Sequence, residues 1–186
     1  MQPAGTAEGG PFEVRELDPA WARVAMGAEE DLVAQRLRRG SRCFGTWAGH
    51  ELVGYGWLSA KSEWIGEIEL EITPAAGEAY VWNCVTLAPH RRKGAFRSLV
   101  RSLVTQAREE GMSRLWIASV SDLGEKAVAQ AGFVPVIRFD RTTRWGLRWT
   151  TIALVAGVDP DLVRAALAVM AVKPGSSLRR SQPRVH

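Results

Sequence analysis

The sequence has only two cysteines, Cys43 and Cys84, and neither lies in a C-x-x-C motif or beside a histidine. This scarcity argues against a disulfide framework and a cysteine-ligated metal, so we expect two buried free thiols and no metal site. Free thiols are typical of a reducing cytoplasm. The sequence also lacks an apolar run long enough to cross a membrane, and residues 1–10 lack the basic and apolar parts of a secretory signal. We therefore expect a cytoplasmic protein with no membrane partner.

The folded body also lacks an excess of charge of one sign. The net charge is +4, and four basic residues near the C-terminus account for it with no acid among them: Lys173, Arg179, Arg180 and Arg184. Residues 1–172 are therefore balanced, which gives no indication of a nucleic-acid partner. We expect a disordered leader at 1–10, one domain with a C-terminal helix at 11–172, and a basic disordered tail at 173–186.

Hydrophobic periodicity predicts alternating strands and helices. Strands are expected at 12–17, 43–47, 51–59, 64–72, 79–87, 115–120, 133–142 and 145–155, and helices between 18 and 39 and at 93–109, 122–131 and 161–172. Antiparallel strands first and strand–helix alternation later predict a mixed α/β sheet with helices packed on it. The apolar face of the last helix suits either packing on the domain or a homodimer contact.

The strongest functional signal is a basic turn between an apolar strand and an amphipathic helix. The strand ends in Val85-Thr86-Leu87, the turn contains Arg91-Arg92-Lys93-Gly94, and the helix follows directly. Backbone N–H groups in the first turn of a helix have no intrahelical acceptor, and the helix dipole adds positive charge there. Cations at this end are unfavourable unless an anion binds, and Gly94 lets the backbone approach phosphate oxygens. The segment predicts a pyrophosphate site; the alternative is a solvated basic helix end.

The segment Arg91-x-x-Gly94-x-Phe96 resembles the R/Q-x-x-G-x-G/A signature of the GNAT superfamily of acyl-CoA-dependent N-acyltransferases. Val85-Thr86-Leu87 is similar to that family's pantetheine-pairing strand, and Ala131-Gly132-Phe133 is similar to the Gly-Phe pair after its next helix. Phe96 departs from the pattern, which prefers glycine or alanine there. The resemblance covers residues 12–155 in element order. It implies a GNAT-like single domain with a central mixed sheet of six or seven strands flanked by helices.

The resemblance implies that acetyl-CoA or another acyl-CoA is the co-substrate. Backbone N–H groups of Val85, Thr86 and Leu87 would hold the thioester carbonyl and the pantetheine arm. The pyrophosphate would lie on the basic turn and the first turn of the helix, which contain Arg91, Arg92, Lys93, Gly94, Ala95, Phe96 and Arg97. Ser121 replaces an asparagine often found at the start of the next helix and would also contact the co-substrate.

The resemblance does not extend to the family's usual acid and base. Alignment on Gly132-Phe133 puts Val128 where a tyrosine often serves as general acid, and Asn83 where an acidic residue is frequent. Neither side chain can transfer a proton at neutral pH. Glu71 and Glu78 remain as candidates for a catalytic base that acts through water.

The residues expected at the acceptor site indicate conflicting substrate charges. Glu67, Glu69 and Glu71 alternate with apolar residues in one expected strand, so their carboxylates would share a face. Glu69 and Glu71 are candidate ligands of a cationic amine, although a solvated sheet face is the better explanation of the pattern alone. Tyr80 and Trp82 alternate on the next strand and suit an aromatic wall. Four arginines near the final strand pair suit an acidic acceptor instead, or are scattered surface residues: Arg138, Arg141, Arg144 and Arg148.

We interpret the sequence as that of an enzyme. It would be an N-acyltransferase that moves an acyl group, most simply acetyl, from acyl-CoA to an amine by direct attack in a ternary complex. The acceptor would be a small-molecule or peptide amine. The alternative is a non-catalytic CoA-binding or protein-interaction module with the same fold, which the missing acid and base favour.

Overall fold

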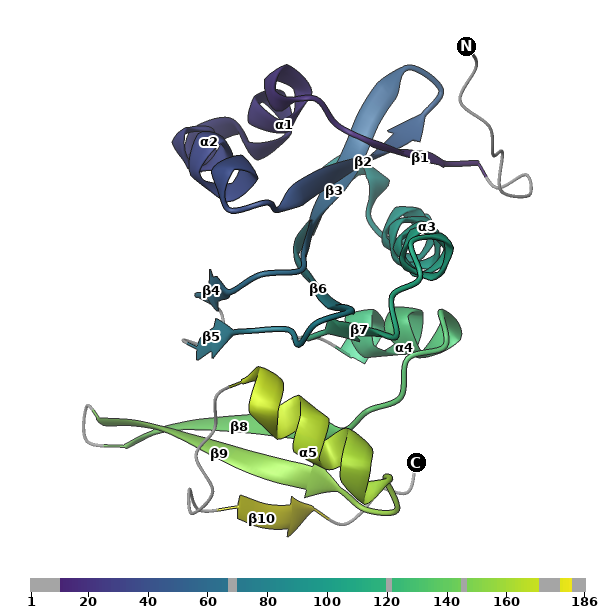
Figure 1. The fold of residues 1–186 in the computed structure, drawn as a ribbon. Coiled ribbons are helices and arrows are strands. Elements are labelled where there is room, and N and C mark those ends of the chain that lie inside the picture. The colour runs from purple at the N-terminus through teal and green to yellow at the C-terminus, as the bar shows by residue number, and fades with distance from the viewer. Residues whose placement is uncertain (1–10, 67–69, 120–121, 145–146, 171–177, 182–186) are drawn as a thin grey trace. The chain divides into compact units, whose positions relative to one another are not determined.

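The computed structural model describes residues 11–66, 70–119, 122–144, 147–170 and 178–181 (Figure 1). These residues form two compact units. The N-terminal unit contains the chain up to Lys61 together with Pro74–Gly132, and the C-terminal unit contains Ser62–Thr73 together with the chain from Phe133 onward. The expectation of one domain at 11–172 stays a prediction.

A five-stranded sheet forms the centre of the N-terminal unit, in the order β1-β2-β3-β6-β7. Its strands are β1 (Glu13–Glu16), β2 (Arg42–Ala48), β3 (Glu51–Ser59), β6 (Glu78–Thr86) and β7 (Arg114–Ile117). Neighbouring strands are antiparallel except β6 and β7, which are parallel. The mixed α/β class is confirmed. The sheet has five strands instead of six or seven because the final strand pair belongs to a separate sheet in the C-terminal unit.

The helices of this unit begin and end where local sequence signals place them. They are α1 (Pro19–Met26), α2 (Asp31–Arg38), α3 (Ala95–Glu109) and α4 (Asp122–Gln130), with short 3-10 turns η1 (Gly27–Glu29) and η2 (Ala88–His90). Asp18 caps α1, because its carboxylate accepts two backbone N–H groups of the first turn at 2.9 Å. Gly111, at φ +71°, follows the end of α3, and the N–H of Met112 donates to the carbonyl oxygen of Ala107 at 2.9 Å.

Helices cover both faces of the five-stranded sheet. On one face, α3 contributes to a buried apolar cluster made of Phe44, Leu58, Ala79, Val81, Leu99 and Leu103. On the other face, Arg36 of α2 lies over the rings of Trp57 and Trp82. Trp57 and Leu58 are successive residues of β3, so their side chains point to opposite faces. The sheet is therefore enclosed between α3 and the α1–α2 pair (Figure 1).

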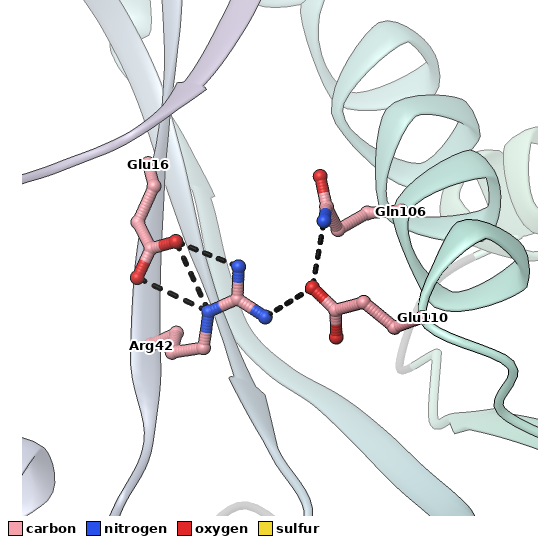
Figure 2. A network of polar contacts seen from close by, with 4 residues as sticks. All are labelled: Glu16, Arg42, Gln106 and Glu110. Carbon is pink, nitrogen blue, oxygen red and sulfur yellow. Dashed lines mark hydrogen bonds and ion pairs between the residues drawn. The ribbon is translucent and has the colours of Figure 1, made fainter.

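An ion-pair network joins the sheet to the end of α3 (Figure 2). Arg42 of β2 donates to Glu16 of β1 at 2.7 Å and to Glu110 at 2.6 Å, and Gln106 donates to the same Glu110 oxygen at 2.6 Å. The hydrogen bond to Glu16 is the largest influence that raises the pKa of Arg42. Partial burial raises the pKa of Glu110, but the hydrogen bonds from Arg42 and Gln106 outweigh it and hold that pKa below its usual value.

Replacing Glu110 by glutamine should remove a stabilising contribution that depends on pH. Because the pKa of Glu110 is lowered in the folded state, its carboxylate stabilises the fold at neutral pH, and this contribution is lost as the pH falls through the lowered pKa. We expect Glu110→Gln to reduce the free energy of unfolding by about 0.5 kcal/mol at neutral pH, as for other partly exposed ion pairs, and to have no effect in strong acid. Denaturant unfolding of both proteins at each pH measures this. An equal loss at both pH values would contradict it.

The C-terminal unit contains the remaining sheets and α5 (Pro160–Val169). β8 (Ile137–Arg144) and β9 (Leu147–Val155) form the antiparallel pair predicted from the sequence, and β10 (Leu178–Ser181) runs parallel to β9. The tail expected to be disordered therefore contains a strand at these 4 residues. In the described part of the chain, no helix is both long and apolar enough to cross a membrane.

Residues 64–72 do not form the single strand predicted from their alternating pattern. β4 (Glu63–Ile65) and β5 (Leu70–Ile72) pair antiparallel, with Ile65 opposite Leu70. The chain turns after Ile65. Apolar residues alternate with polar ones both before and after this turn, so the sequence pattern resembles that of one continuous strand. Glu71 is exposed on β5, whereas Glu67 and Glu69 lie outside the described residues. The inference that three carboxylates share one strand face therefore loses its basis.

Candidate functional site

The strands β6 and β7 separate halfway along β6. Their ladder begins with Glu78 opposite Arg114 and ends with Val81 opposite Ile117, whereas β6 continues to Thr86 (Figure 1). In the described part of the chain, no ladder pairs residues 82–86 on the β7 side of the sheet. Unpaired strand edges present backbone N–H and C=O groups that an extended ligand can bind. The predicted residues Val85 and Thr86 lie on this edge, and Leu87 follows it.

A bulge interrupts β6 where the unpaired edge begins. Tyr55 of β3 lies opposite Val85 and Trp57 lies opposite Trp82, so Asn83 and Cys84 together face Gly56. Asn83 takes up the extra residue with a φ of +43°, a left-handed conformation that asparagine tolerates better than most side chains. A bulge changes the direction in which the following backbone groups point. The bulge therefore sets the aim of the N–H groups of residues 83–87.

Gly56 makes the bulge sterically feasible. A Cβ at this position would lie 2.8 Å from Sγ of Cys84 and 2.9 Å from Cδ2 of Leu99, which is closer than real Cβ contacts allow. The sequence pattern placed Gly56 in a plain alternating strand. The close approach of Cys84 gives this glycine a specific packing role opposite the bulge.

The turn after β6 has the backbone geometry expected for an anion site. Arg92 and Gly94 both have positive φ, at +63° and +97°. Gly94 is the N-cap of α3 and receives no help from a capping side chain. By contrast, Asp18 and Asp159 cap α1 and α5 with their carboxylates. The first-turn N–H groups of α3 thus remain directed at the turn, where an anion is favoured.

The basic side chains of the turn are exposed and make few hydrogen bonds to the protein. Arg91, Arg92 and Lys93 are exposed, and Nε of Arg91 donates to the carbonyl oxygen of Thr86 at 3.2 Å. Arg97 is also exposed and donates to Gln130 of α4 at 3.3 Å. These side chains add positive charge around the turn. Of the other residues predicted here, Ala95 is buried and Phe96 is half-buried in the first turn of α3.

The two aromatic residues proposed as an acceptor wall are buried. Tyr80 is 5% exposed and Trp82 is 8% exposed. The indole N–H of Trp82 donates to Oγ of Ser59 at 2.9 Å, and its ring lies 6.1 Å from that of Trp57. Both aromatic residues precede the bulge in β6. Arg36, which lies over Trp82, has no signal in the sequence, because nothing in the pattern of α2 relates it to β6.

The candidate bases occupy different surroundings. Glu78 is 6% exposed; it pairs with Arg114 and accepts from the indole N–H of Trp116 at 2.7 Å. Its carboxylate is therefore already bound at the paired end of β6. Glu71 is exposed and belongs to the C-terminal unit. Ser121 lies outside the described residues, and Val128, which stands at the expected tyrosine position, is buried in α4.

The two cysteines are free. Cys43 is fully buried, and burial raises its pKa to about 12, which makes it a poor nucleophile. Cys84 is half-buried, and its Sγ lies 3.7 Å from the carbonyl oxygen of Trp82. The predicted burial is thus confirmed for Cys43 and only partial for Cys84.

Two solved structures are similar to this chain at low sequence identity. A protein from Agrobacterium tumefaciens that is named as an acetyltransferase matches with a TM-score of 0.50 at 16% identity, over 66% of this chain and 92% of that one. A ribosomal-protein-alanine N-acetyltransferase from Brucella melitensis matches with a TM-score of 0.49 at 18% identity, over 65% of this chain and 90% of that one. At these identities the likeness concerns the fold. A sequence search among curated proteins finds no match.

The family assignment comes from the sequence itself. The model of the acetyltransferase (GNAT) family matches residues 11–133. This match contains the five-stranded sheet, the β6 bulge and the turn before α3, and it ends where the chain enters the second segment of the C-terminal unit. The chain therefore belongs to the GNAT family of acetyltransferases.

Proposed function

We propose that this chain transfers an acyl group, most simply acetyl, from acyl-CoA to an amine within a ternary complex. One observation carries the proposal: β6 leaves β7 after Val81 and leads, through a bulge, into an uncapped helix N-terminus at Gly94. An extended acyl donor such as acyl-CoA would use both the unpaired strand edge and the helix N-terminus. The strand edge suits the amide-containing pantetheine arm, and the helix N-terminus suits the pyrophosphate.

The residues of the turn fit such a co-substrate. Gly94 has the positive φ that side chains rarely adopt, and a Cβ there would lie 3.4 Å from Nη2 of Arg97. Its bare backbone therefore leaves the approach to the first helical turn open. Arg91, Arg92, Lys93 and Arg97 would surround the phosphates with positive charge, while the N–H groups of Ala95, Phe96 and Arg97 would donate to phosphate oxygens.

The acyl transfer itself requires little from side chains. The lone pair of a neutral amine attacks the thioester carbonyl carbon, the C–N bond forms, and the C–S bond breaks as coenzyme A leaves. Backbone N–H groups near Val85 would donate to the carbonyl oxygen as negative charge develops on it. Val128 cannot protonate the departing sulfur, so coenzyme A would leave as a thiolate or take a proton from water. Positioning alone can supply much of the rate.

The acceptor's proton would pass to water. Glu78 is unsuited to receive it because Arg114 and Trp116 already hold its carboxylate. Glu71, the other candidate predicted from the sequence, has an exposed carboxylate and belongs to the C-terminal unit, so the proposed site on β6 and α3 does not depend on it. The acceptor would be a small-molecule or peptide amine.

Calorimetric titration of acetyl-CoA and of coenzyme A into the full chain tests the proposal. We expect micromolar binding of both, followed by release of free thiol when a panel of small amines and peptides is added with acetyl-CoA. Binding without thiol release across the panel would favour the non-catalytic CoA-binding module. Failure of the folded protein to bind either ligand would overturn the proposed function.

A further inference from the structure

An arginine from α2 lies against Trp57 and Trp82, which are paired across β3 and β6 next to the bulge. The guanidinium carbon of Arg36 is 4.4 Å from the ring centroid of Trp82 and 5.1 Å from that of Trp57. Its side chain is 11% exposed. Arg36 also lies 3.9 Å from the carboxylate of Glu29 and donates to the sulfur of Met26 at 3.2 Å. A guanidinium buried against indole rings is held in a fixed place by cation–π attraction.

The same guanidinium contacts the bulged residue itself. With its amide oxygen turned toward α2, Asn83 accepts from Nη1 of Arg36 at 2.7 Å and from Nη2 at 3.0 Å. Both donors of one planar fork thus meet one oxygen. Charge-assisted bonds of this kind are stronger than neutral ones. They hold a residue whose backbone, at φ +43°, lies in a sparsely populated conformation.

A second set of hydrogen bonds holds the indole of Trp82. Ser41 and Ser59 share a hydrogen bond of 2.6 Å between their hydroxyls, and Ser59 accepts from the indole N–H of Trp82 at 2.9 Å. All three side chains are buried. These hydrogen bonds restrain the indole of Trp82, and the guanidinium of Arg36 lies over this indole. The fork of Arg36 therefore meets Asn83 at a position set by the sheet.

We propose that Arg36 is a positioning residue that clamps the Asn83 bulge so that the following N–H groups of β6 point at the acyl-pantetheine end of the co-substrate. The inference rests on the proposed function. It states that one side chain sets the direction of the backbone N–H groups that would polarise the thioester. Without the fork, Asn83 loses its charged donors and the left-handed conformation loses its support. The peptide groups after it then sample directions that do not converge on the carbonyl.

The proposed contact between Arg36 and Asn83, called the clamp below, predicts that a variant of Arg36 weakens binding of the pantetheine end of acetyl-CoA and leaves binding of its nucleotide end unchanged. Arg36→Met keeps an unbranched apolar side chain over Trp82 and Trp57 but removes both donors to Asn83. We expect it to weaken acetyl-CoA binding about tenfold, because it removes charge-assisted hydrogen bonds that support the bulge. Binding of adenosine 3′,5′-bisphosphate, which has the nucleotide end of coenzyme A but no pantetheine, should stay within about twofold of wild type, since it uses the turn at Gly94. The kcat of any transfer detected should fall as well.

Two further variants make the test specific. Asn83→Gly keeps a residue that adopts positive φ but removes the amide that Arg36 binds, and in this background Arg36→Met should have no additional effect on acetyl-CoA binding. Arg42→Met is the matched control, because Arg42 also lies over a ring, at 5.0 Å from that of Phe44, and pairs with carboxylates away from the bulge. We expect it to lower the melting temperature and leave the ratio of the two affinities unchanged.

The outcomes separate the clamp from the proposed function. If wild type binds neither acetyl-CoA nor the bisphosphate, the proposed function fails. If wild type binds both and Arg36→Met binds acetyl-CoA as wild type does, the clamp is wrong. If Arg36→Met weakens both ligands equally, or its effect adds fully to that of Asn83→Gly, Arg36 supports the fold in general and the positioning role is overturned.

Discussion

Replacing Gly94 by tryptophan should weaken acetyl-CoA binding by at least about a hundredfold, because two or more charge-assisted backbone hydrogen bonds would be lost together. Gly94 is the N-cap of α3, its φ is +97°, and a Cβ there already approaches Nη2 of Arg97. An indole at this position would stand where the phosphates approach the first helical turn. Calorimetric titration of acetyl-CoA and of adenosine 3′,5′-bisphosphate measures the loss. Both ligands should be affected, since both carry the phosphates.

Gly111 provides a matched control for the backbone strain of this substitution. It lies at the opposite end of α3, it also has positive φ, at +71°, and a Cβ there would meet nothing within 4 Å. Gly111→Trp therefore imposes a similar left-handed penalty, about 1–2 kcal/mol, without entering the turn. We expect it to reduce stability and to leave both affinities near those of wild type. Equal loss of binding in the two variants would mean that strain in α3, and not the turn, governs the result.

The parts of the fold that the sequence predicted are those with strong local signals. The strands at 43–47 and 51–59, the helix start after residue 18 and the helix end at 109 each depend on a few neighbouring residues. The structure has the β2–β3 hairpin, the cap at Asp18 and the stop at Gly111 in these places. The turn at Gly94 also has a strong local signal, because a basic segment between a strand and a helix N-terminus is by itself typical of an anion site. Local chemistry thus predicted where the candidate phosphate site lies along the chain.

The parts that the sequence did not predict depend on contacts between distant residues. The bulge at Asn83 is visible only once β3 and β6 are in register, with Gly56 opposite two residues. Arg36 and Asn83 are far apart in the chain, and no periodicity relates them. The sheet size failed for a similar reason, since strand propensity at 137–155 says nothing about which sheet those strands join. Composition and pattern determine elements better than they determine partners.

Replacing Glu78 by alanine should show that this glutamate stabilises the fold and does not transfer protons. Its carboxylate is buried, pairs with Arg114 and accepts from Trp116. Removing it leaves the indole N–H without that acceptor and Arg114 without its counter-ion. We expect the free energy of unfolding to fall by about 2–3 kcal/mol, less than for a fully buried pair because the Arg114 side chain is 37% exposed. Denaturant unfolding measures this.

Measurements of kcat for this variant and for Glu71→Ala distinguish the two carboxylates that the sequence predicted as candidate bases. Below its melting temperature, Glu78→Ala should keep the kcat and the pH profile of wild type, since Arg114 and Trp116 hold this carboxylate and it does not take the proton in the proposed reaction. Glu71→Ala replaces an exposed side chain, so its stability should change by less than about 0.5 kcal/mol. If Glu71 relays the proton, kcat falls in that variant alone. A loss of kcat in Glu78→Ala with unchanged stability would reverse the assignment, because it would show that the carboxylate leaves Arg114 and Trp116 during turnover.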